Sequence, residues 1–335
     1  MQLKRSHLLK LFLATGLAPI IHPFTHSTDA AATPDPLPSW QDSPVKAAIV
    51  TFVQQATTEG GPGCIPPRDR IATFDNDGTL WCEQPLAQGV FVVDQLKAQL
   101  EANPALATQP VIVALLEGNK DHFAQPDALA ELVQVLGALS ANMPQAEFDR
   151  QAVAFLETAT HPQFNVHYTE MGYLPQVELL AYLQANGFQT WICSGGGIDF
   201  VRLLSETMYG IMPQQVIGSS LEKEYRQVNG EGVIWRLPDI DLVNDKEGKP
   251  VGIDRAIGQP PVFACGNVRS GGDIAMLTYS QSVPYPSFQL LINHDDAVRE
   301  FAYSEPDNAS LNAASQNGWQ VVSMKTDWKT IFSWQ

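Results

Sequence analysis

The spacing of apolar residues divides the chain into stretches of different character. Apolar positions recur at helical spacing over residues 44–57, and the short apolar run at 71–74 is typical of a buried strand. Between residues 85 and 161 the spacing is helical throughout. From residue 175 onward, apolar strands alternate with amphipathic helices. This alternation predicts an α/β fold with a parallel sheet that carries helices on both faces.

Turn residues mark where the elements of the alternating part end. Gly187 and Gly210 close two predicted helices, and Asn229-Gly230 is a strong signal for a hairpin turn. Helices are expected at 44–57, 175–186 and 198–209, and strands at 71–74, 188–193, 215–218, 225–228, 233–237, 262–265 and 288–293. Active sites on such sheets lie at the carboxyl ends of the strands, so polar residues there are candidates for function.

The helical stretch has the pattern of a domain of its own. Four helices are expected in it, at 86–100, 105–117, 127–139 and 145–158. Prolines stand near the starts of three of these helices, where their missing N–H costs nothing. We therefore expect a helical cap at 85–173, inserted into the parallel-sheet core formed by 33–84 and 174–335.

Composition and charge narrow the class of protein. The 335 residues are 44% apolar and 17% charged, as in an ordinary globular protein. The net charge of −16 repels nucleic acid and gives no general attraction for anionic ligands. We expect no nucleic-acid partner, and an anionic substrate would need a few local cations.

The first 32 residues have the pattern of an export signal. A basic segment is followed by an apolar run at 11–21 and by small alanines at 30–32, which suit signal peptidase. The apolar run is shorter than the roughly 20 residues that span a bilayer. We expect residues 1–32 to be removed and the mature protein to be secreted or periplasmic, without a membrane span. The alternative is an amphipathic N-terminal helix, which Pro19 and Pro23 disfavour.

Most of the four cysteines are expected to be small buried side chains. Cys193 and Cys265 end apolar runs, and Cys82 lies just past another. Cys64, in a loop rich in glycine and proline, is the one candidate for a disulfide in an exported chain.

The first candidate for chemistry is the segment 74–79, Phe-Asp-Asn-Asp-Gly-Thr, at the end of an apolar strand. Asp75 and Asp77 are two positions apart, so their carboxylates point the same way if the strand geometry continues. Two acids so close need a cation or a shared proton. Phosphoryl transfer fits, because one carboxylate can attack phosphorus while the other handles the proton, with Mg²⁺ on the oxygen ligands. The alternative is an Asx-rich turn that caps the next helix.

Three further segments carry candidate ligands for a phosphate or a metal. Ser194 and the three glycines after it offer a hydroxyl and backbone N–H groups at a helix start, which is a natural phosphate cradle. Lys249 precedes a proline and can reach a phosphate as a point charge. Asp273 opens an apolar helix and can complete an oxygen-ligand set for Mg²⁺. Taken singly, Ser194 and Asp273 also fit ordinary helix N-caps.

In this order, the four segments resemble the four motifs of the haloacid dehalogenase superfamily. The resemblance covers the chain from about residue 71 to 293 and is strongest to the phosphoserine-phosphatase-like branch. It implies a Rossmann-like core with an α-helical cap inserted between the first two motifs. Asp77 favours a phosphatase or phosphotransferase, because the dehalogenases of this superfamily expel halide and lack that second aspartate.

The resemblance also implies a role for each matching residue. Asp75 would be the nucleophile that forms an aspartyl phosphate, and Asp77 the general acid that protonates the leaving alcohol and then activates water. Mg²⁺ would be held by the Asp75 carboxylate, the Asp77 carbonyl and Asp273. The implied phosphate-binding residues are Ser194, Gly195 and Lys249.

The fourth segment departs from the family pattern. Asn267 and Asp273 are six positions apart, where the family usually has four. Two glycines between them can let the loop bulge and still deliver Asp273, with Asn267 binding a water on the metal. Arg269, on the same loop, is either an added phosphate contact or a solvated side chain. Glu83 and Trp81 follow the first motif and either touch the leaving group or pack at the hinge to the cap.

A further acidic segment follows the last predicted strand. Residues 293–296, Asn-His-Asp-Asp, resemble a metal cluster, and a helix N-cap explains them as well.

The sequence therefore predicts a secreted, Mg²⁺-dependent phosphatase that acts on small phosphomonoesters through Asp75. Two alternatives stay open. One is a phosphotransferase that passes the phosphoryl group to an alcohol. The other is a secreted binding protein that keeps the fold without turnover.

Overall fold

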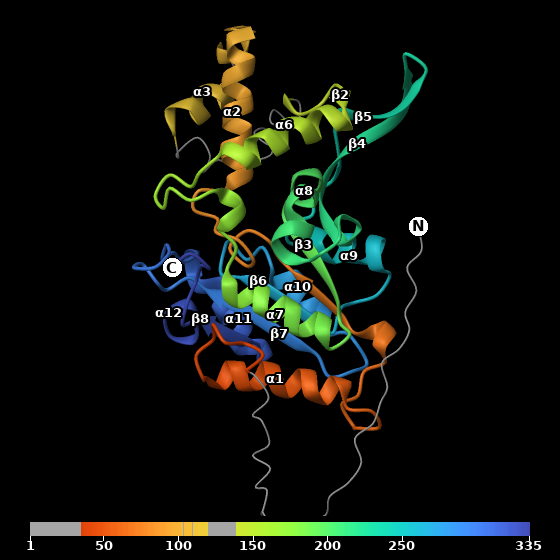
Figure 1. Cartoon of the computed structure of the whole chain (residues 1–335), viewed down its shortest axis with the longest axis vertical. Helices are drawn as coiled ribbons and strands as arrows, with labels where there is room; N and C mark the ends of the chain where they lie inside the picture. The colour runs from red at the N-terminus through yellow and green to blue at the C-terminus, as the bar shows by residue number, and fades with distance from the viewer. Residues whose placement is uncertain (1–34, 103, 109, 120–138) are drawn as a thin grey trace, which may run out of the picture. The chain divides into compact units, whose positions relative to one another are not determined.

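One sheet organises the part of the chain that the computed structural model describes, residues 35–102, 104–108, 110–119 and 139–335 (Figure 1). Residues 36–335 form a single unit by their contacts, and the fold below is that of this unit. The described strands are β1 (Ile71–Phe74), β2 (Met143–Pro144), β3 (Gln189–Gly197), β4 (Val216–Val228), β5 (Glu231–Leu242), β6 (Phe263–Asn267), β7 (Phe288–Asn293) and β8 (Gln320–Ser323). They lie in the order β2-β5-β4-β3-β1-β6-β7-β8.

The strands from β4 to β8 in this order are parallel neighbours, and only β5 and β2 run antiparallel to the strand beside them. This confirms the predicted α/β fold with a mostly parallel sheet. Every residue of β1 is buried, as expected for a central strand covered on both faces. Phe74 of β1 stacks on Phe263 of β6. The centre of the sheet is therefore an apolar support for whatever follows β1.

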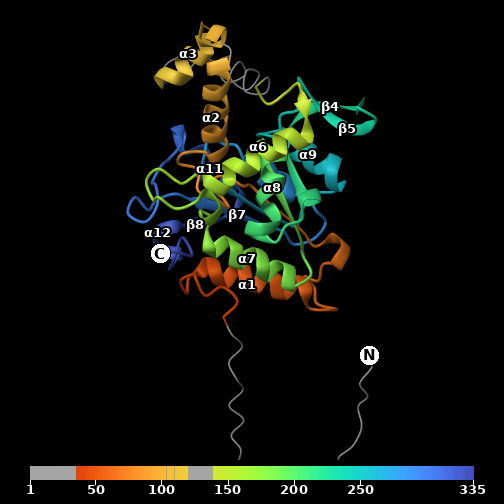
Figure 2. The same cartoon turned by 45° about the horizontal axis from the view of Figure 1, so that its top comes forward.

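Helices cover both faces of the sheet, as predicted. The described helices are α1 (Pro44–Thr57), α2 (Ala87–Ala102), α3 (Pro110–Glu117), α6 (Gln145–Thr158), α7 (Leu174–Ala185), α8 (Ile198–Tyr209), α9 (Gly248–Ile257), α10 (Ile274–Ser280), α11 (Ala309–Asn317) and α12 (Met324–Asp327). One apolar cluster joins α1, α7 and α8 to the sheet, and a second joins α9, α10 and α11 to it. Figure 2 shows α1 and α7 side by side. Each helix buries one apolar stripe, which is what a layered fold requires.

Several predicted elements match the structure to the residue, namely those at 44–57, 71–74, 145–158, 198–209 and 288–293. Other predictions were wrong in detail, and among them the strand expected at 233–237 extends over Glu231–Leu242. The strand expected at 188–193 continues through Gly197, and those at 215–218 and 225–228 form one strand, β4, because pairing with β5 keeps the chain extended. The helix expected at 105–117 begins as a 3₁₀ turn, Pro104–Thr108. The helix expected at 127–139 lies, up to its last residue, outside the described residues.

All four cysteines belong to the described residues, and none forms a disulfide. Cys82, Cys193 and Cys265 are buried, as predicted, and Cys64 is unpaired. Among the described residues, no helix is long and apolar enough to cross a membrane.

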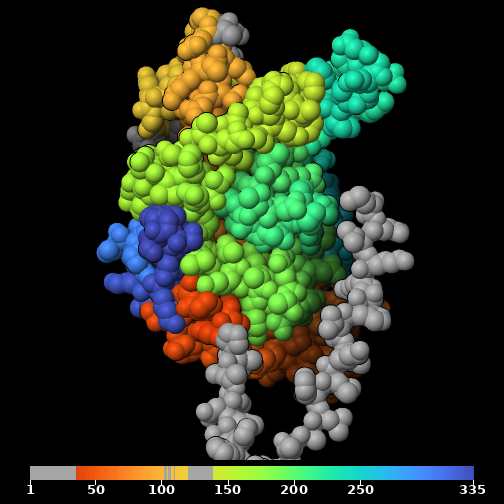
Figure 3. All heavy atoms as spheres, in the orientation of Figure 1, coloured from red at the N-terminus to blue at the C-terminus, as the bar shows by residue number. Residues whose placement is uncertain are grey.

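The β4–β5 hairpin extends beyond the parallel part of the sheet and packs against the helical stretch, where β2 pairs with β5 (Figure 3). Arg236 of β5 is the centre of this contact. Its guanidinium donates to the Ser140 carbonyl at 2.7 Å, pairs with Asp199 of α8, and lies 3.9 Å from the centre of the Phe148 ring of α6. The hairpin, which the sequence assigned to the core, thus contacts the helical stretch directly. The division into a core and a cap at 85–173 stays a prediction.

We expect Arg236→Met to lower the free energy of unfolding by about 3 kcal/mol, because it removes a buried cation from a set of buried partners. The measurement is urea unfolding followed by tryptophan fluorescence. Arg255→Met is the matched control, since Arg255 is 56% exposed and lies 3.8 Å from Asp241. That change should cost about 0–1 kcal/mol. Equal losses in the two variants would contradict a structural role for Arg236.

Candidate active site

Three neighbouring strands deliver the residues that the sequence singled out. Asp75 directly follows β1, and its N–H donates to the Cys265 carbonyl of β6 at 2.9 Å. Asn267 ends β6, and Ser194 lies in β3, the other neighbour of β1. Because β3, β1 and β6 are parallel, their carboxyl ends meet at one edge of the sheet.

Lys249, in the first turn of α9, links two acidic side chains at this edge. Its Nζ lies 2.7 Å from Oδ1 of Asp75 and also contacts Oδ1 of Asp273. Lys249 and Asp273 are each only 2% exposed, and Asp75 is 8% exposed. Residues that are far apart in the sequence are therefore joined in one buried ion-pair cluster.

Asp273 reaches this lysine despite the longer loop before it. Its Oδ2 accepts the Asn267 N–H at 2.9 Å, and it lies so close to Gly266 that a Cβ at this glycine would overlap it. Ser270 and Gly271 adopt positive φ angles of 53° and 66°, which turn the loop back toward the sheet. The side chain of Asp273 makes no capping hydrogen bond to α10, so it is directed into the cluster instead.

Burial and neighbouring charges shift the pKa of both Asp75 and Lys249. Burial, followed by the nearby Asp273 carboxylate, raises the pKa of Asp75 well above its usual range, while Lys249 opposes this. For Lys249, burial lowers the pKa, but Asp273 and Asp75 together raise it more, so the net shift is upward. The lysine thus stays charged between the two acids. With both acids ionised, the cluster would carry an excess negative charge, which a proton on Asp75 or a further cation would relieve.

The turn after β1 is held from two sides. Gly78 has a φ of +77°, and a Cβ on it would overlap the Asn267 side chain. Its N–H donates to the Trp81 carbonyl at 2.7 Å, and its own carbonyl lies 2.7 Å from Nε2 of His294. In a trans peptide the carbonyl and N–H point to opposite sides. The Asp77 carbonyl is therefore directed away from Trp81.

Asp77 has the titration behaviour of a group that can give and take a proton. Burial, followed by the neighbouring Glu83 carboxylate, raises the pKa of Asp77 to about 6. Its Oδ1 is buried and has no hydrogen-bond partner among the described residues. An acid with a pKa near the working pH is suited to proton transfer.

Glu83 and Arg269 form an ion pair beside Gly78. Arg269 contacts Oε2 of Glu83, and Asn267 Nδ2 lies 3.1 Å from Oε1 of the same carboxylate. The Glu83 side chain is 1% exposed, whereas that of Arg269 is 40% exposed. A Cβ on Gly78 would lie 2.8 Å from Oε1 of Glu83, which places the pair against the turn that carries Asp77.

Trp81 is fully buried and packs at the start of the helical stretch. Its indole N–H donates to the Tyr168 carbonyl at 2.8 Å, and its ring meets that of Tyr168 edge-on. Of the two roles expected for Trp81, this geometry favours packing over contact with a substrate.

The end of β3 after Ser194 is already tied by two hydrogen bonds. The Ser194 hydroxyl accepts the Gly196 N–H at 2.9 Å, and the Gly197 N–H donates to Oε1 of Gln88 at 2.8 Å. Gln88 belongs to α2, and its Nε2 is buried without a partner among the described residues. A Cβ on Gly196 would overlap this amide. Sequence reasoning missed Gln88, because nothing in its local pattern shows that α2 approaches the end of β3.

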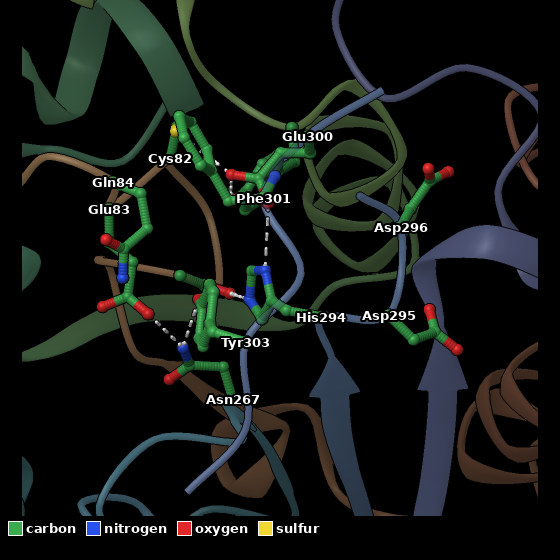
Figure 4. A network of polar contacts seen from close by, with 12 residues as sticks. Cys82, Glu83, Gln84, Asn267, His294, Asp295, Asp296, Glu300, Phe301 and Tyr303 are labelled. Carbon is green, nitrogen blue, oxygen red and sulfur yellow. Dashed lines mark hydrogen bonds and ion pairs between the residues drawn. The ribbon is translucent and has the colours of Figure 1, made fainter. Parts of the chain in front are cut away.

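A buried polar network centred on His294 and Glu300 (Figure 4) contacts the Gly78 turn. His294, after β7, faces Gly78 through one ring nitrogen and Glu300 through the other, at 3.4 Å. Glu300 also accepts from the Tyr173 hydroxyl at 3.1 Å and from the Cys82 thiol at 3.1 Å. Tyr303 stacks on His294, and its hydroxyl lies 3.4 Å from Nδ2 of Asn267, so the network is joined to the other side chain that packs against the turn.

The two acids next to His294 point away from it in Figure 4 and cap turns. Asp295 accepts from Ser323 Oγ at 2.6 Å, and Asp296 accepts from the Val298 N–H at 3.0 Å. Of the two explanations for residues 293–296, the structure favours capping over a metal cluster.

The residues present fit a divalent cation in their donor chemistry. In the described part of the chain, no three His, Cys, Asp or Glu side chains form a ready-made metal cluster. The expected set needs only two such side chains, Asp75 and Asp273, because its third ligand is the carbonyl of Asp77. All three donors are oxygens, which Mg²⁺ prefers. The unpartnered, buried Oδ1 of Asp77 supports the same conclusion.

A scan against protein-family models finds the haloacid dehalogenase-like hydrolases over residues 72–278, which is more than half of the chain. The protein therefore belongs to the haloacid dehalogenase-like hydrolase family. The match spans Asp75, Ser194, Lys249 and Asp273. No curated protein sequence matches the chain.

Solved structures share the fold at low sequence identity. A functionally unknown protein from Anaerococcus prevotii is 14% identical, with a TM-score of 0.55, over 87% of this chain and 96% of that one. A protein of unknown function from Bordetella pertussis is 16% identical, with a TM-score of 0.49, over 76% and 98%. A phosphoserine phosphohydrolase-like protein from Francisella tularensis is 14% identical, with a TM-score of 0.38, over 76% and 94%. Of these three, the Anaerococcus prevotii protein has the highest TM-score, and its likeness supports the fold described above.

We expect Gly78→Ala to destabilise the protein more than Gly60→Ala. The two glycines have nearly equal φ angles, +77° and +73°, so both variants carry the left-handed strain of about 1–2 kcal/mol. Only Gly78 would add an overlap with Asn267, since nothing lies within 4 Å of a Cβ at Gly60. Urea unfolding measures the difference. A Gly78→Ala variant as stable as Gly60→Ala would contradict the tight turn described above.

Proposed function

We propose that the protein is a phosphatase that hydrolyses small phosphomonoesters through an aspartyl phosphate on Asp75. The observation that carries the proposal is the buried bridge from Lys249 to both Asp75 and Asp273. Such a lysine can hold a nucleophilic carboxylate in place and neutralise an incoming phosphate. Membership in the hydrolase family supports the same chemistry.

In the first step, an oxygen of the Asp75 carboxylate bonds to phosphorus while the bond from phosphorus to the alcohol oxygen breaks. The Asp77 carboxyl gives its proton to the departing alkoxide. In the second step, water attacks the phosphorus, gives a proton to Asp77, and the bond between Asp75 and phosphorus breaks. Inorganic phosphate leaves, and both acids return to their starting states.

Asp75, Asp273 and the Asp77 carbonyl would hold Mg²⁺, which supplies charge neutralisation to the phosphoryl group when bound. Ser194 and Gly195 would bind the phosphoryl oxygens together with Lys249. The hydrogen bond from the Gly197 N–H to Gln88 supports a role for α2 in covering the end of β3. The helical stretch 85–173 would then act as a cap that excludes water while Asp75 is being phosphorylated.

The test is phosphate release from a panel of phosphomonoesters, with Mg²⁺ and with a chelator. We expect Mg²⁺-dependent release that Asp75→Asn reduces by about 10³-fold or more, because an amide cannot replace the nucleophile. Asp254→Asn, an exposed aspartate of α9, is the control and should keep full activity. Undiminished turnover in Asp75→Asn would refute the mechanism, provided that circular dichroism shows both variants to be folded.

We also propose that the protein is exported and that residues 1–32 are removed. The basic start, the apolar run at 11–21 and the alanines at 30–32 support this. N-terminal sequencing of the protein, expressed from the full sequence in a bacterial host, should find a chain that begins just after residue 32 in the periplasmic or secreted fraction. An intact N-terminus in the cytoplasmic fraction would exclude it.

A further inference from the structure

The loop between Asn267 and Asp273 is built to hold one side chain, that of Arg269. Its backbone is fixed at several points. The Val268 N–H donates to the Ile292 carbonyl at 2.9 Å, and the Gly271 N–H donates to Glu305 at 2.7 Å. Glu305 is 7% exposed and also accepts the Ser310 N–H at the start of α11. These hydrogen bonds hold the backbone of the loop in place. The backbone position from which the Arg269 side chain extends is therefore fixed.

Both carboxylate oxygens of Glu83 already accept from a neighbouring side chain. Oε2 is paired with Arg269, Oε1 accepts from Asn267, and the side chain is almost fully buried. A substrate cation would have to share the carboxylate with these partners or displace one of them. The exposed member of the pair is the arginine, whose guanidinium has five N–H donors, of which only Nη1 has a partner here among the described residues.

The pair lies where a leaving group would be. Asp77, the proposed acid that protonates the leaving alcohol, is followed directly by Gly78, against which Glu83 and Asn267 pack. The second cation of the site, Lys249, is buried and is engaged by two carboxylates on the nucleophile side. The leaving-group side therefore presents a partly exposed positive charge in a chain of net charge −16.

We propose that Arg269 selects phosphomonoesters whose alcohol part carries a second anionic group, a carboxylate or a phosphate, and that esters with an ammonium group are poor substrates. This inference rests on the proposed phosphatase function. A guanidinium matches a carboxylate or phosphate in geometry as well as charge, because two parallel N–H groups can face two oxygens. Its remaining donors are free to do so while Nη1 stays on Glu83.

Three esters of similar size test this: 3-phosphoglycerate, glycerol 3-phosphate and phosphoethanolamine, with anionic, neutral and cationic alcohol parts. For the unaltered protein with Mg²⁺, we expect kcat/KM to fall in that order. In Arg269→Gln, the ratio of kcat/KM for 3-phosphoglycerate over glycerol 3-phosphate should fall by about ten- to a hundred-fold, mostly through KM. Arg269→Lys should restore part of the ratio.

Arg226→Gln is the matched control. Arg226 lies near the turn of the β4–β5 hairpin, its side chain is 40% exposed like that of Arg269, and it is also paired with a glutamate. This variant should leave the ratio unchanged. Glu83→Gln is the complementary change, which frees the guanidinium from its carboxylate and should raise the preference for 3-phosphoglycerate.

Two results would overturn the inference. The first is a preference of the unaltered protein for phosphoethanolamine that Glu83→Gln abolishes, because Glu83 would then be the selecting residue. The second is hydrolysis of all three esters with a ratio that Arg269→Gln does not change. Both differ from failure of the proposed function, which would appear as no Mg²⁺-dependent release from any of the three esters.

Discussion

The buried lysine between Asp75 and Asp273 is the interaction on which the site depends. Two carboxylates at the edge of an apolar sheet would be costly without a cation, because burial disfavours their charged forms. Lys249 relieves part of this cost, and its own charge is retained because the acids surround it. The three groups come from β1, α9 and the start of α10, so the fold must be complete before the charges meet. The ion-pair cluster therefore depends on the packing of these three elements around one side chain.

Around the ion-pair cluster of Lys249, Asp75 and Asp273, hydrogen bonds and close contacts hold the backbone in place as well as the side chains. Gly78 is locked between the Trp81 carbonyl and His294, and Gly266 leaves room for Asp273. These glycines carry no chemistry of their own, but they set the distances between the groups that do. A polar network around His294 and Glu300 then supports the turn.

Sequence reasoning found what is encoded locally and missed what depends on contacts between distant segments. Asp75, Lys249 and Asp273 stand next to recognisable strand or helix boundaries, so they could be identified from the chain alone. Gln88 and Arg236 could not be identified in this way. Gln88 contacts Gly197, 109 residues away, and Arg236 contacts Asp199, 37 residues away, and no local sequence pattern indicates either contact. The strand β3 was predicted too short for a related reason. Glycines after Ser194 favour a turn locally, but pairing of Gly197 with Ser219 keeps that segment extended.

The arrangement of strands also bears on aggregation through the edges of the sheet. Open sheet edges are templates for aggregation, and prolines, charges and very short strands blunt them. At one described edge stands β8, with four residues. At the other, β2 covers only Trp235 and Arg236 of β5, and the uncovered part of β5 carries Pro238, Asp239 and Asp241. Both margins of the sheet are therefore poor starting points for strand addition, which favours a protein that stays dispersed at high concentration.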